Sequence, residues 1–233
     1  MNFYMSYFAR RAPQINIHYN APKPTGKPKR ATDVKNLPAL ISGVELDPNL
    51  LDFNLAASYG EVRLRFVYYY QIIEYAGFYW VEDSVKNSIC KILQSPDLQT
   101  RLDEYIPRLL DALVQRNQDH EAKMRKVVEV RVNASDLWKE IIAEWDFFTT
   151  TQMFDGGFVV EPLVSKETTQ DAFEKMWTPK IFNMLKNIRN ALVHARENRS
   201  EAVILPTVAN DERLRPWIPL IRRVAEQITI YDQ

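Results

Sequence analysis

The amino-acid sequence predicts a mainly α-helical protein, in which a helical bundle carries a small β-hairpin and follows an extended basic N-terminal arm. Three observations lead to this fold class. Apolar residues recur at helical spacing through most of the chain after residue 50. One short segment, Met153–Val164, interrupts that spacing with an Asp-Gly-Gly turn and several valines. The first 45 residues combine basic side chains with frequent prolines, which disfavour a helix.

The N-terminal arm is expected over residues 1–45, and the helical domain over residues 46–233. The chain as a whole is neutral, but residues 1–36 hold seven Lys or Arg against one Asp, a net charge of +6. Such an arm can contact the phosphates of RNA, lie on the acidic surface of its own domain or of a partner, or act as a solvated linker. We favour the last two, because no aromatic residue interleaves the basic side chains between Ala21 and Asn36.

The first long helix is expected to begin at Asp47-Pro48, where a capping side chain precedes a proline. Its apolar residues continue to about Leu93, which predicts one long helix or two collinear helices broken near Ala76 and Gly77. This segment also holds the densest group of aromatic residues. They surround the helix instead of lining one face, so we assign them to the core and to a dimer contact in preference to stacking on RNA bases.

Further elements follow from cap residues and apolar spacing. Helices are expected over residues 98–116, bent or shortened by Pro107, over residues 120–132 and over residues 137–148. After the hairpin, Ala202–Pro206 is a second strand-like segment that is a candidate to pair with it, and a closing helix is expected over residues 211–231. The single cysteine, Cys90, excludes an intrachain disulfide and is expected to be an inert core residue.

The most informative segment is Thr178–Arg199, which predicts an amphipathic helix. Its apolar residues recur every three or four positions and form one stripe that faces a core: Ile181, Leu185, Ile188, Leu192 and Ala195. On the opposite face, Asn190 and His194 are one turn apart, and Arg189 at the flank can reach toward His194. The helix thus gathers an imidazole, a permanent cation and an amide on its exposed side.

The segment Ile188–Ala195 resembles the signature of the HEPN superfamily, in which an Arg, usually followed by Asn, Asp or His, precedes a His late in a helical bundle. Proteins of that family are commonly metal-independent endoribonucleases of toxin–antitoxin, abortive-infection and RNA-processing systems. The resemblance implies a HEPN-like bundle, catalysis by Arg189, Asn190 and His194, and no metal or other cofactor. In family toxins silenced by a nucleotidyltransferase antitoxin, a Tyr follows the His by two positions. Arg196 stands there instead, which argues against regulation by nucleotide addition at that site.

The same three residues suit RNA cleavage by attack of the 2′-hydroxyl on the adjacent phosphorus. An imidazole such as that of His194 can exchange a proton near neutral pH, and the fork of Arg189 can grip two phosphate oxygens. Asn190 can orient the imidazole or hold a phosphate oxygen. Lys186, Arg196 and Arg199 are weaker candidates for RNA contact, because basic residues near a helix C-terminus are favourable without any ligand.

The expected partners follow from this chemistry. The reaction needs an acid and a base, whereas one chain supplies one such His, so we expect a homodimer with a composite active site that binds RNA. The resemblance also suggests an antitoxin or other regulatory partner protein. The N-terminus does not resemble a signal peptide, and the most apolar window, Phe66–Val81, is too short to span a membrane and contains Glu74. We therefore expect a cytoplasmic protein without a membrane partner.

Two other interpretations remain open at this level. The domain can be a non-catalytic HEPN-like module, in which the same face binds a partner protein or a nucleotide and dimerisation is the output. Alternatively, the chain is an unrelated helical protein in which Arg189 and His194 coincide by chance. RNA cleavage by the wild type and by His194→Ala separates these interpretations from the enzymatic one.

Overall fold

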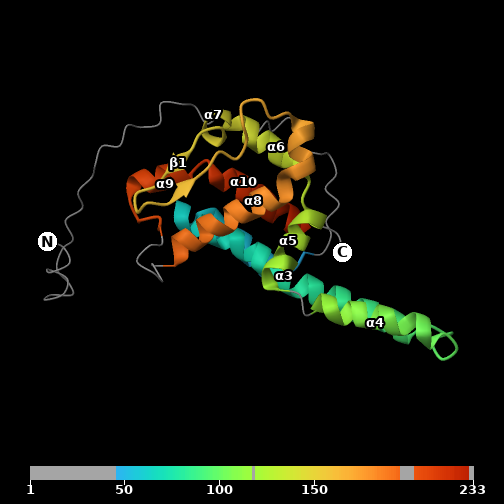
Figure 1. The fold of residues 1–233 in the computed structure, drawn as a ribbon. Coiled ribbons are helices and arrows are strands. Elements are labelled where there is room, and N and C mark those ends of the chain that lie inside the picture. The colour runs from blue at the N-terminus through green and yellow to red at the C-terminus, as the bar shows by residue number, and fades with distance from the viewer. Residues whose placement is uncertain (1–45, 117–118, 195–201, 231–233) are drawn as a thin grey trace, which may run out of the picture. The chain divides into compact units, whose positions relative to one another are not determined.

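The computed structural model describes residues 46–116, 119–194 and 202–230, all of which belong to one compact unit, Ser42–Gln233 (Figure 1). This part of the chain is mainly helical, with two very short strands, as the sequence predicts. The arm expected over residues 1–45 lies outside the described residues. Among the residues that are described, no helix combines the length and the apolar character needed to cross a lipid bilayer.

The first described helices are α2 (Pro48–Tyr59) and α3 (Val62–Leu93), which pack against each other. As predicted, Asp47 caps α2, and its carboxylate accepts a hydrogen bond from the backbone N–H of Asn49 at 2.8 Å. The chain leaves the helix at Gly60, whose backbone is extended. The break therefore lies near Gly60, and the predicted break near Ala76 and Gly77 is wrong. The two helices are also not collinear, because α2 folds back onto α3.

Gly77 does not break α3 but allows another helix to approach it closely. It faces α5 (His120–Arg131), and a Cβ atom at this position would lie 2.8 Å from Cγ and 2.9 Å from Cα of Met124. Real Cβ atoms essentially never come so near to another atom. The absent side chain thus lets α5 pack directly on the backbone of α3.

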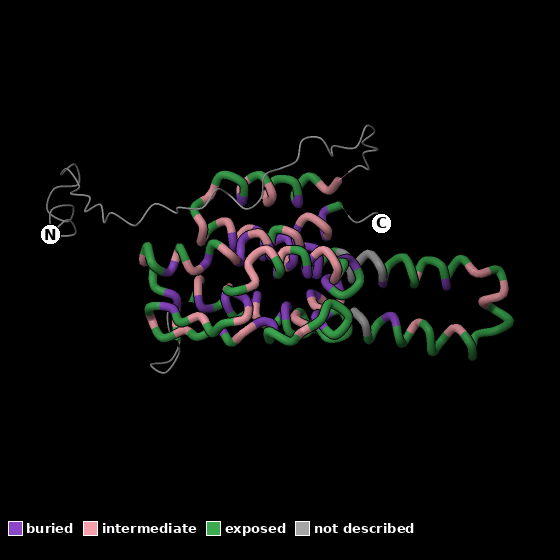
Figure 2. The backbone as a smooth tube through the Cα atoms, turned by 90° about the horizontal axis from the view of Figure 1, so that it is seen from above, coloured by how far each residue is buried: buried purple, intermediate pink, exposed green. Residues whose placement is uncertain are grey.

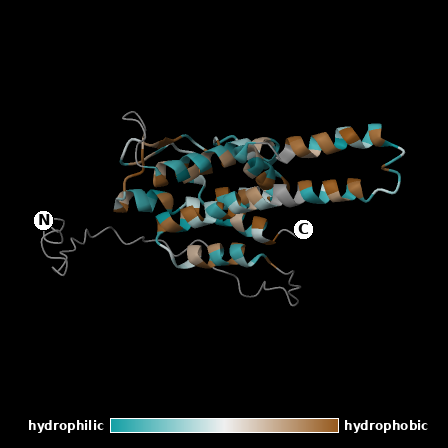
Figure 3. Ribbon diagram, turned by 90° about the horizontal axis from the view of Figure 1, so that it is seen from below, coloured by the Kyte–Doolittle hydropathy of each residue, from teal (hydrophilic) through white to brown (hydrophobic). Residues whose placement is uncertain are grey.

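The C-terminal half of α3 and α4 (Leu102–Arg116) form a helical pair that extends away from the bundle (Figures 1 and 2). The residues before Leu102 form turns, in which Asp97 accepts a hydrogen bond from the Tyr105 hydroxyl at 2.7 Å, so α4 begins later than predicted. Because a pair of helices buries little surface by itself, Cys90, which lies in this part of α3, is exposed. The prediction of a buried cysteine is therefore wrong. Figure 3 shows hydrophobic residues along both helices of the pair.

Two of the predicted helices are divided. The helix expected over residues 137–148 is α6 (Ala134–Ala143), capped by Asn133, followed by α7 (Trp145–Phe148). The closing helix is α9 (Val208–Leu214) followed by α10 (Trp217–Ile230), with Pro216 between them. Between these pairs lies α8 (Gln170–Val193), which is capped by Thr169 and holds the segment with the Arg-Asn-His group.

The predicted hairpin is present as β1 (Gln152–Met153) and β2 (Val159–Val160), which pair in antiparallel register. Its turn contains Gly156 and Gly157 at positive φ angles of 110° and 87°, a conformation that favours glycine. The segment after α8 joins the hairpin as expected, since Val203 forms a parallel bridge with Gly157. Two backbone hydrogen bonds hold it there, from Val203 to Gly156 at 3.2 Å and from Leu205 to Asp155 at 3.0 Å.

The hydrophobic core lies among α3, α5, α6, α8 and α10, where Figure 2 shows the buried positions. Among the aromatic residues of α3, Phe66, Tyr69 and Tyr70 are buried, as the core interpretation predicts. Phe78 and Tyr79 are instead about half exposed, at 49% and 48%. The core assignment therefore holds for Phe66, Tyr69 and Tyr70 and not for Phe78 and Tyr79, and the dimer contact stays a prediction.

Candidate functional site

Helix α8 places the candidate site by burying one face and leaving the other accessible. Ile181, Leu185 and Ile188 are at most 1% exposed, so the predicted apolar stripe does face the core. Leu192 is half-buried, and Ala195 lies outside the described residues. On the other side of the helix, Asn190 is exposed, as the amphipathic pattern predicts.

The helix ends at Val193, before the end expected at Arg199, and His194 is its C-cap residue. His194 has an extended backbone, with φ −89° and ψ 113°, and its N–H still donates to the carbonyl of Asn190 at 2.9 Å. Its side chain is exposed. The imidazole is therefore held at the edge of the domain by one backbone hydrogen bond and by its own contacts.

Arg189 joins the three predicted residues into one group. Its Nη1 atom lies 3.1 Å from Nε2 of His194 and 3.2 Å from Oδ1 of Asn190. A guanidinium N–H can only donate, so the contact uses the lone pair of Nε2, and the neutral imidazole then carries its proton on Nδ1. The expectation that Arg189 reaches His194 from the flank of the helix is thus confirmed.

Two residues of α3 complete the surroundings of Arg189, and neither was predicted to belong to the site. Nη2 of Arg189 lies 2.9 Å from Oε1 of Glu74, and both side chains are about a quarter exposed, at 24% and 26%. The guanidinium carbon lies 5.8 Å from the centre of the Tyr70 ring, within the range of a cation–π contact. The cation is therefore fixed by a carboxylate and an aromatic face as well as by its own helix.

A sequence signal for these two residues does exist. Glu74 is the only charged residue in the apolar window Phe66–Val81, and a carboxylate in a mostly buried helix needs a cationic partner. Tyr70 precedes it by four positions and so shares its helix face. Burial, and then the charge of Glu74, raise the pKa of Tyr70 well above its usual range, whereas Arg189 lowers it. The phenol therefore stays protonated.

Of the three weaker candidates for RNA contact, only Lys186 lies among the described residues. Lys186 forms an ion pair with Glu121 of α5 at 2.8 Å, and this hydrogen bond holds the pKa of Glu121 below its ordinary value. Much of the positive charge of Lys186 is thus balanced within the domain, and its contact with RNA stays a prediction. Arg196 and Arg199 lie outside the described residues.

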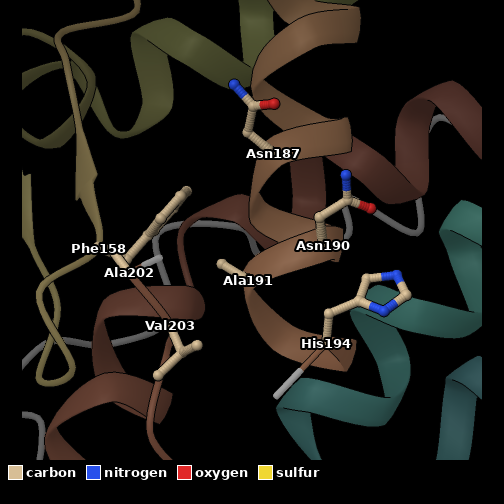
Figure 4. A pocket seen from close by; sticks show the side chains of 7 residues that line it. All are labelled: Phe158, Asn187, Asn190, Ala191, His194, Ala202 and Val203. Carbon is tan, nitrogen blue, oxygen red and sulfur yellow. The ribbon is translucent and has the colours of Figure 1, made fainter. Parts of the chain in front are cut away.

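A pocket of about 450 Å³ opens beside His194 (Figure 4). One side belongs to α8, with Asn187, Asn190, Ala191 and His194, and the other side to the hairpin and the segment that joins it. These latter residues are Phe158, Ala202 and Val203. Figure 4 shows Phe158 and Val203 across from α8, so the walls come from parts of the chain that are distant in sequence.

No protein-family model, curated protein or solved structure matches the chain. The fold and the site themselves define its class, a mainly helical protein with an Arg-Asn-His group at the end of α8. Within the described residues, no three His, Cys, Asp or Glu side chains lie close enough together to hold a metal ion.

Proposed function

We propose that the protein is a HEPN-type, metal-independent endoribonuclease that cuts RNA through attack of the 2′-hydroxyl group. The observation that carries this proposal is the 3.1 Å contact between Arg189 and His194 on an accessible edge of the domain. It pairs a group that can exchange protons with a permanent cation at the distance of one hydrogen bond. The open pocket beside His194 leaves room for a substrate.

In the proposed reaction, the RNA phosphate displaces part of the contact between Arg189 and His194. The guanidinium turns its N–H groups to two phosphate oxygens and stabilises the charge of the phosphorane. The lone pair of Nε2 on His194 then takes the proton of the 2′-hydroxyl. The 2′-oxygen forms a bond to phosphorus while the bond to the 5′-oxygen breaks. The products are a 2′,3′-cyclic phosphate and a 5′-hydroxyl, after an acid has protonated the leaving oxygen.

The proposal includes a homodimer, because the leaving 5′-oxygen needs a proton that one imidazole cannot deliver while it accepts another. Of the three His residues in the sequence, only His194 belongs to the Arg-Asn-His group, whereas His18 belongs to the sequence of the basic arm and His120 begins α5. A two-fold axis beside His194 would bring the same group of a second copy to one cleft. Each chain would then contribute one His and one Arg to the composite site.

The biological setting is part of the proposal through the family resemblance alone. An RNA-cutting enzyme of this kind fits a cytoplasmic toxin or an abortive-infection system, in which degradation of RNA limits the growth of the infected cell. Such an enzyme has to be held inactive until it is needed. The proposed partners are therefore RNA, a second copy of the chain, and an antitoxin or other regulatory protein.

A second candidate function is a non-catalytic binding module. The observation that favours it is that the guanidinium of Arg189 is already engaged by Glu74, Asn190 and His194. The carboxylate of Glu74 balances its charge, which leaves less attraction for a phosphate. In that case the exposed face of α8 would bind a partner protein or nucleotide without cutting RNA.

Cleavage assays with matched variants test the proposal. The wild type, Arg189→Ala and His194→Ala are incubated with a panel of RNAs in a buffer with a metal chelator, and the RNA ends are sequenced. We expect specific cuts by the wild type and a loss of at least a hundredfold in rate for either variant. Arg215→Ala serves as a control, because Arg215 lies after α9 and pairs with Glu212 at the surface.

The same samples test the composite site. Light scattering at the assay concentration should give twice the chain mass of 27.3 kDa. Cleavage by a sample that is wholly monomeric would contradict the composite site and leave the roles of Arg189 and His194 intact. Equal cleavage by wild type and both variants would contradict the enzymatic proposal itself.

A further inference from the structure

We propose that the pocket beside His194 binds one unpaired nucleobase of the RNA strand, next to the phosphate that is cut. This inference rests on the proposed function, because it names the part of the substrate that adjoins the reacting group. The volume of about 450 Å³ lies within the range typical of sites for small ligands, about 300–1,000 Å³. The pocket is therefore large enough for a base and its ribose.

Phe158 supplies a wall on which a base can stack. Its ring packs beside that of Phe154, with 6.0 Å between the ring centres, and Phe154 is buried at 4% exposure. The carbonyl of Phe158 accepts a hydrogen bond from the N–H of Phe154 at 2.9 Å, which fixes its backbone in the hairpin. The half-buried ring is thus held in place while part of it faces the pocket. Single-stranded RNA is commonly bound by such stacking of bases on fixed aromatic rings.

Asn187 and Asn190 supply hydrogen-bonding groups on the opposite wall. Asn187 is exposed, and its amide has no hydrogen-bond partner in the part of the chain that the structure describes. The oxygen of Asn190 already accepts from Arg189, so its amide nitrogen is the group that faces a ligand. An asparagine amide offers a donor and an acceptor side by side, which matches the donor and acceptor pairs on the edges of bases.

The distribution of charge agrees with a base in the pocket and a phosphate at its edge. Apart from His194, the described lining residues carry no ionisable side chain. A neutral base can enter such a pocket without the cost of burying a charge. Arg189 contacts His194, which lines the pocket, so the phosphate attached to the bound nucleotide would meet the guanidinium there.

Calorimetry with defined probes tests this assignment. The probes are the four ribonucleoside 3′-monophosphates and inorganic phosphate, which shares their charge but lacks a base. We expect at least one nucleotide to bind tenfold or more tightly than phosphate. Phe158→Leu and Asn187→Ala should each lower the affinity for that nucleotide about tenfold and leave the affinity for phosphate unchanged.

The controls are neighbours that do not line the pocket. Val159→Ala changes the exposed residue next to Phe158, and Asn183→Ala removes an exposed amide one turn before Asn187. Both controls should bind like the wild type. Circular dichroism checks the fold of every variant, and Phe158→Tyr, which keeps the ring, should retain nucleotide binding. Asn187 is exposed, so its variant gives a result even where a change at Phe158 unfolds the protein.

Three results would overturn the inference. Nucleotides that bind no better than phosphate would mean that the pocket holds no base. Equal nucleotide binding by the wild type, Phe158→Leu and Asn187→Ala would place the base elsewhere. The third result is a nucleotide that binds more tightly than phosphate, while Asn187→Ala cuts RNA beside the same bases as the wild type. The pocket would then bind a free nucleotide instead of RNA. A protein that cuts no RNA would contradict the proposed function, while the calorimetry would still decide whether the pocket holds a base.

Discussion

At the scale of single residues, the state of Arg189 decides what the site can do. Its guanidinium contacts Glu74 and Tyr70 on α3 as well as Asn190 and His194 at the end of its own helix. A cation fixed from several sides loses little freedom when a phosphate arrives, which favours catalysis. The same contacts balance its charge, which opposes phosphate binding. In the proposed reaction, Glu74 would act as a positioning residue, and its removal would separate these two effects.

The variant Glu74→Gln tests that role. Without the carboxylate, the guanidinium is free to leave His194, and we expect kcat for RNA cleavage to fall about tenfold to a hundredfold. KM should change less or even fall, because the charge of Arg189 is no longer balanced. Glu129→Gln, an exposed change on α5, is the matched control. An unaltered kcat in a variant with the wild-type melting temperature would show that Glu74 does not position Arg189.

The pair of Lys186 and Glu121 gives a prediction about pH. The hydrogen bond from Lys186 lowers the pKa of Glu121 in the folded protein. A lowered carboxyl pKa contributes stability above the unfolded pKa, and this contribution is lost as the pH falls through the folded value. In Lys186→Met, we expect the pKa of Glu121 to rise toward its ordinary range, as measured by carboxyl ¹³C NMR. Lys175→Met should leave the pKa of Glu121 unchanged. An equal pKa of Glu121 in both variants would show that the hydrogen bond from Lys186 does not lower it.

At the scale of elements, the pocket depends on how the hairpin is fastened to the segment after α8. Asn210 on α9 is fully buried, and it accepts from the N–H of Asp155 at 2.8 Å. Its amide nitrogen donates to the carbonyls of Asp155 and Leu205, each at 2.9 Å. One side chain thus joins both parts of the chain that face α8 across the pocket.

The variant Asn210→Ala should therefore loosen that wall. It leaves buried backbone groups without partners, and we expect the free energy of unfolding to fall by about 2–4 kcal/mol. Chemical denaturation measures this loss. The exposed change Asn183→Ala should stay within about 0.5 kcal/mol of the wild type. A similarly small effect of Asn210→Ala would show that these hydrogen bonds do not hold the hairpin.

The contact between α3 and α5 gives a second prediction at this scale. In Gly77→Ala, the added methyl group gains about 1 kcal/mol of helix propensity, but it overlaps the backbone of Met124 at a cost of about 1–3 kcal/mol. We expect a net loss in the free energy of unfolding. In Gly60→Ala the methyl group comes no nearer than 3.4 Å to its neighbours, so this control should be close to neutral. A stabilised Gly77→Ala would contradict the close approach.

The same elements show what the sequence could predict and where it failed. The apolar stripe of α8 and the glycine turn of the hairpin follow from local patterns, and both were predicted. Gly77 was misread as a break because its cause, the backbone of α5, is distant in sequence. Cys90 was misread because apolar spacing does not say whether a helix has neighbours on every side. For the same reason, Glu74 and Phe158 were not connected with the candidate site.

At the scale of the whole molecule, we propose that a helical bundle holds Arg189 and His194 together so that they can act on one RNA phosphate. The domain supplies the scaffold through the core between α3 and α8, and the hairpin supplies a wall beside the reacting group. In the same proposal, a second copy of the chain supplies the second proton transfer. In the proposed function, all of these features serve a single chemical step, the attack of a 2′-hydroxyl on phosphorus.

That step can be measured on an RNA oligonucleotide with one mapped cut and on the same oligonucleotide with a single 2′-deoxyribose just before the cut. Mass spectrometry identifies the product ends. We expect the wild type to leave a 2′,3′-cyclic phosphate and a 5′-hydroxyl, and neither the deoxy substrate nor His194→Ala to give a product. Cleavage of the deoxy substrate at the same position, or unchanged cleavage by His194→Ala, would contradict the proposed reaction.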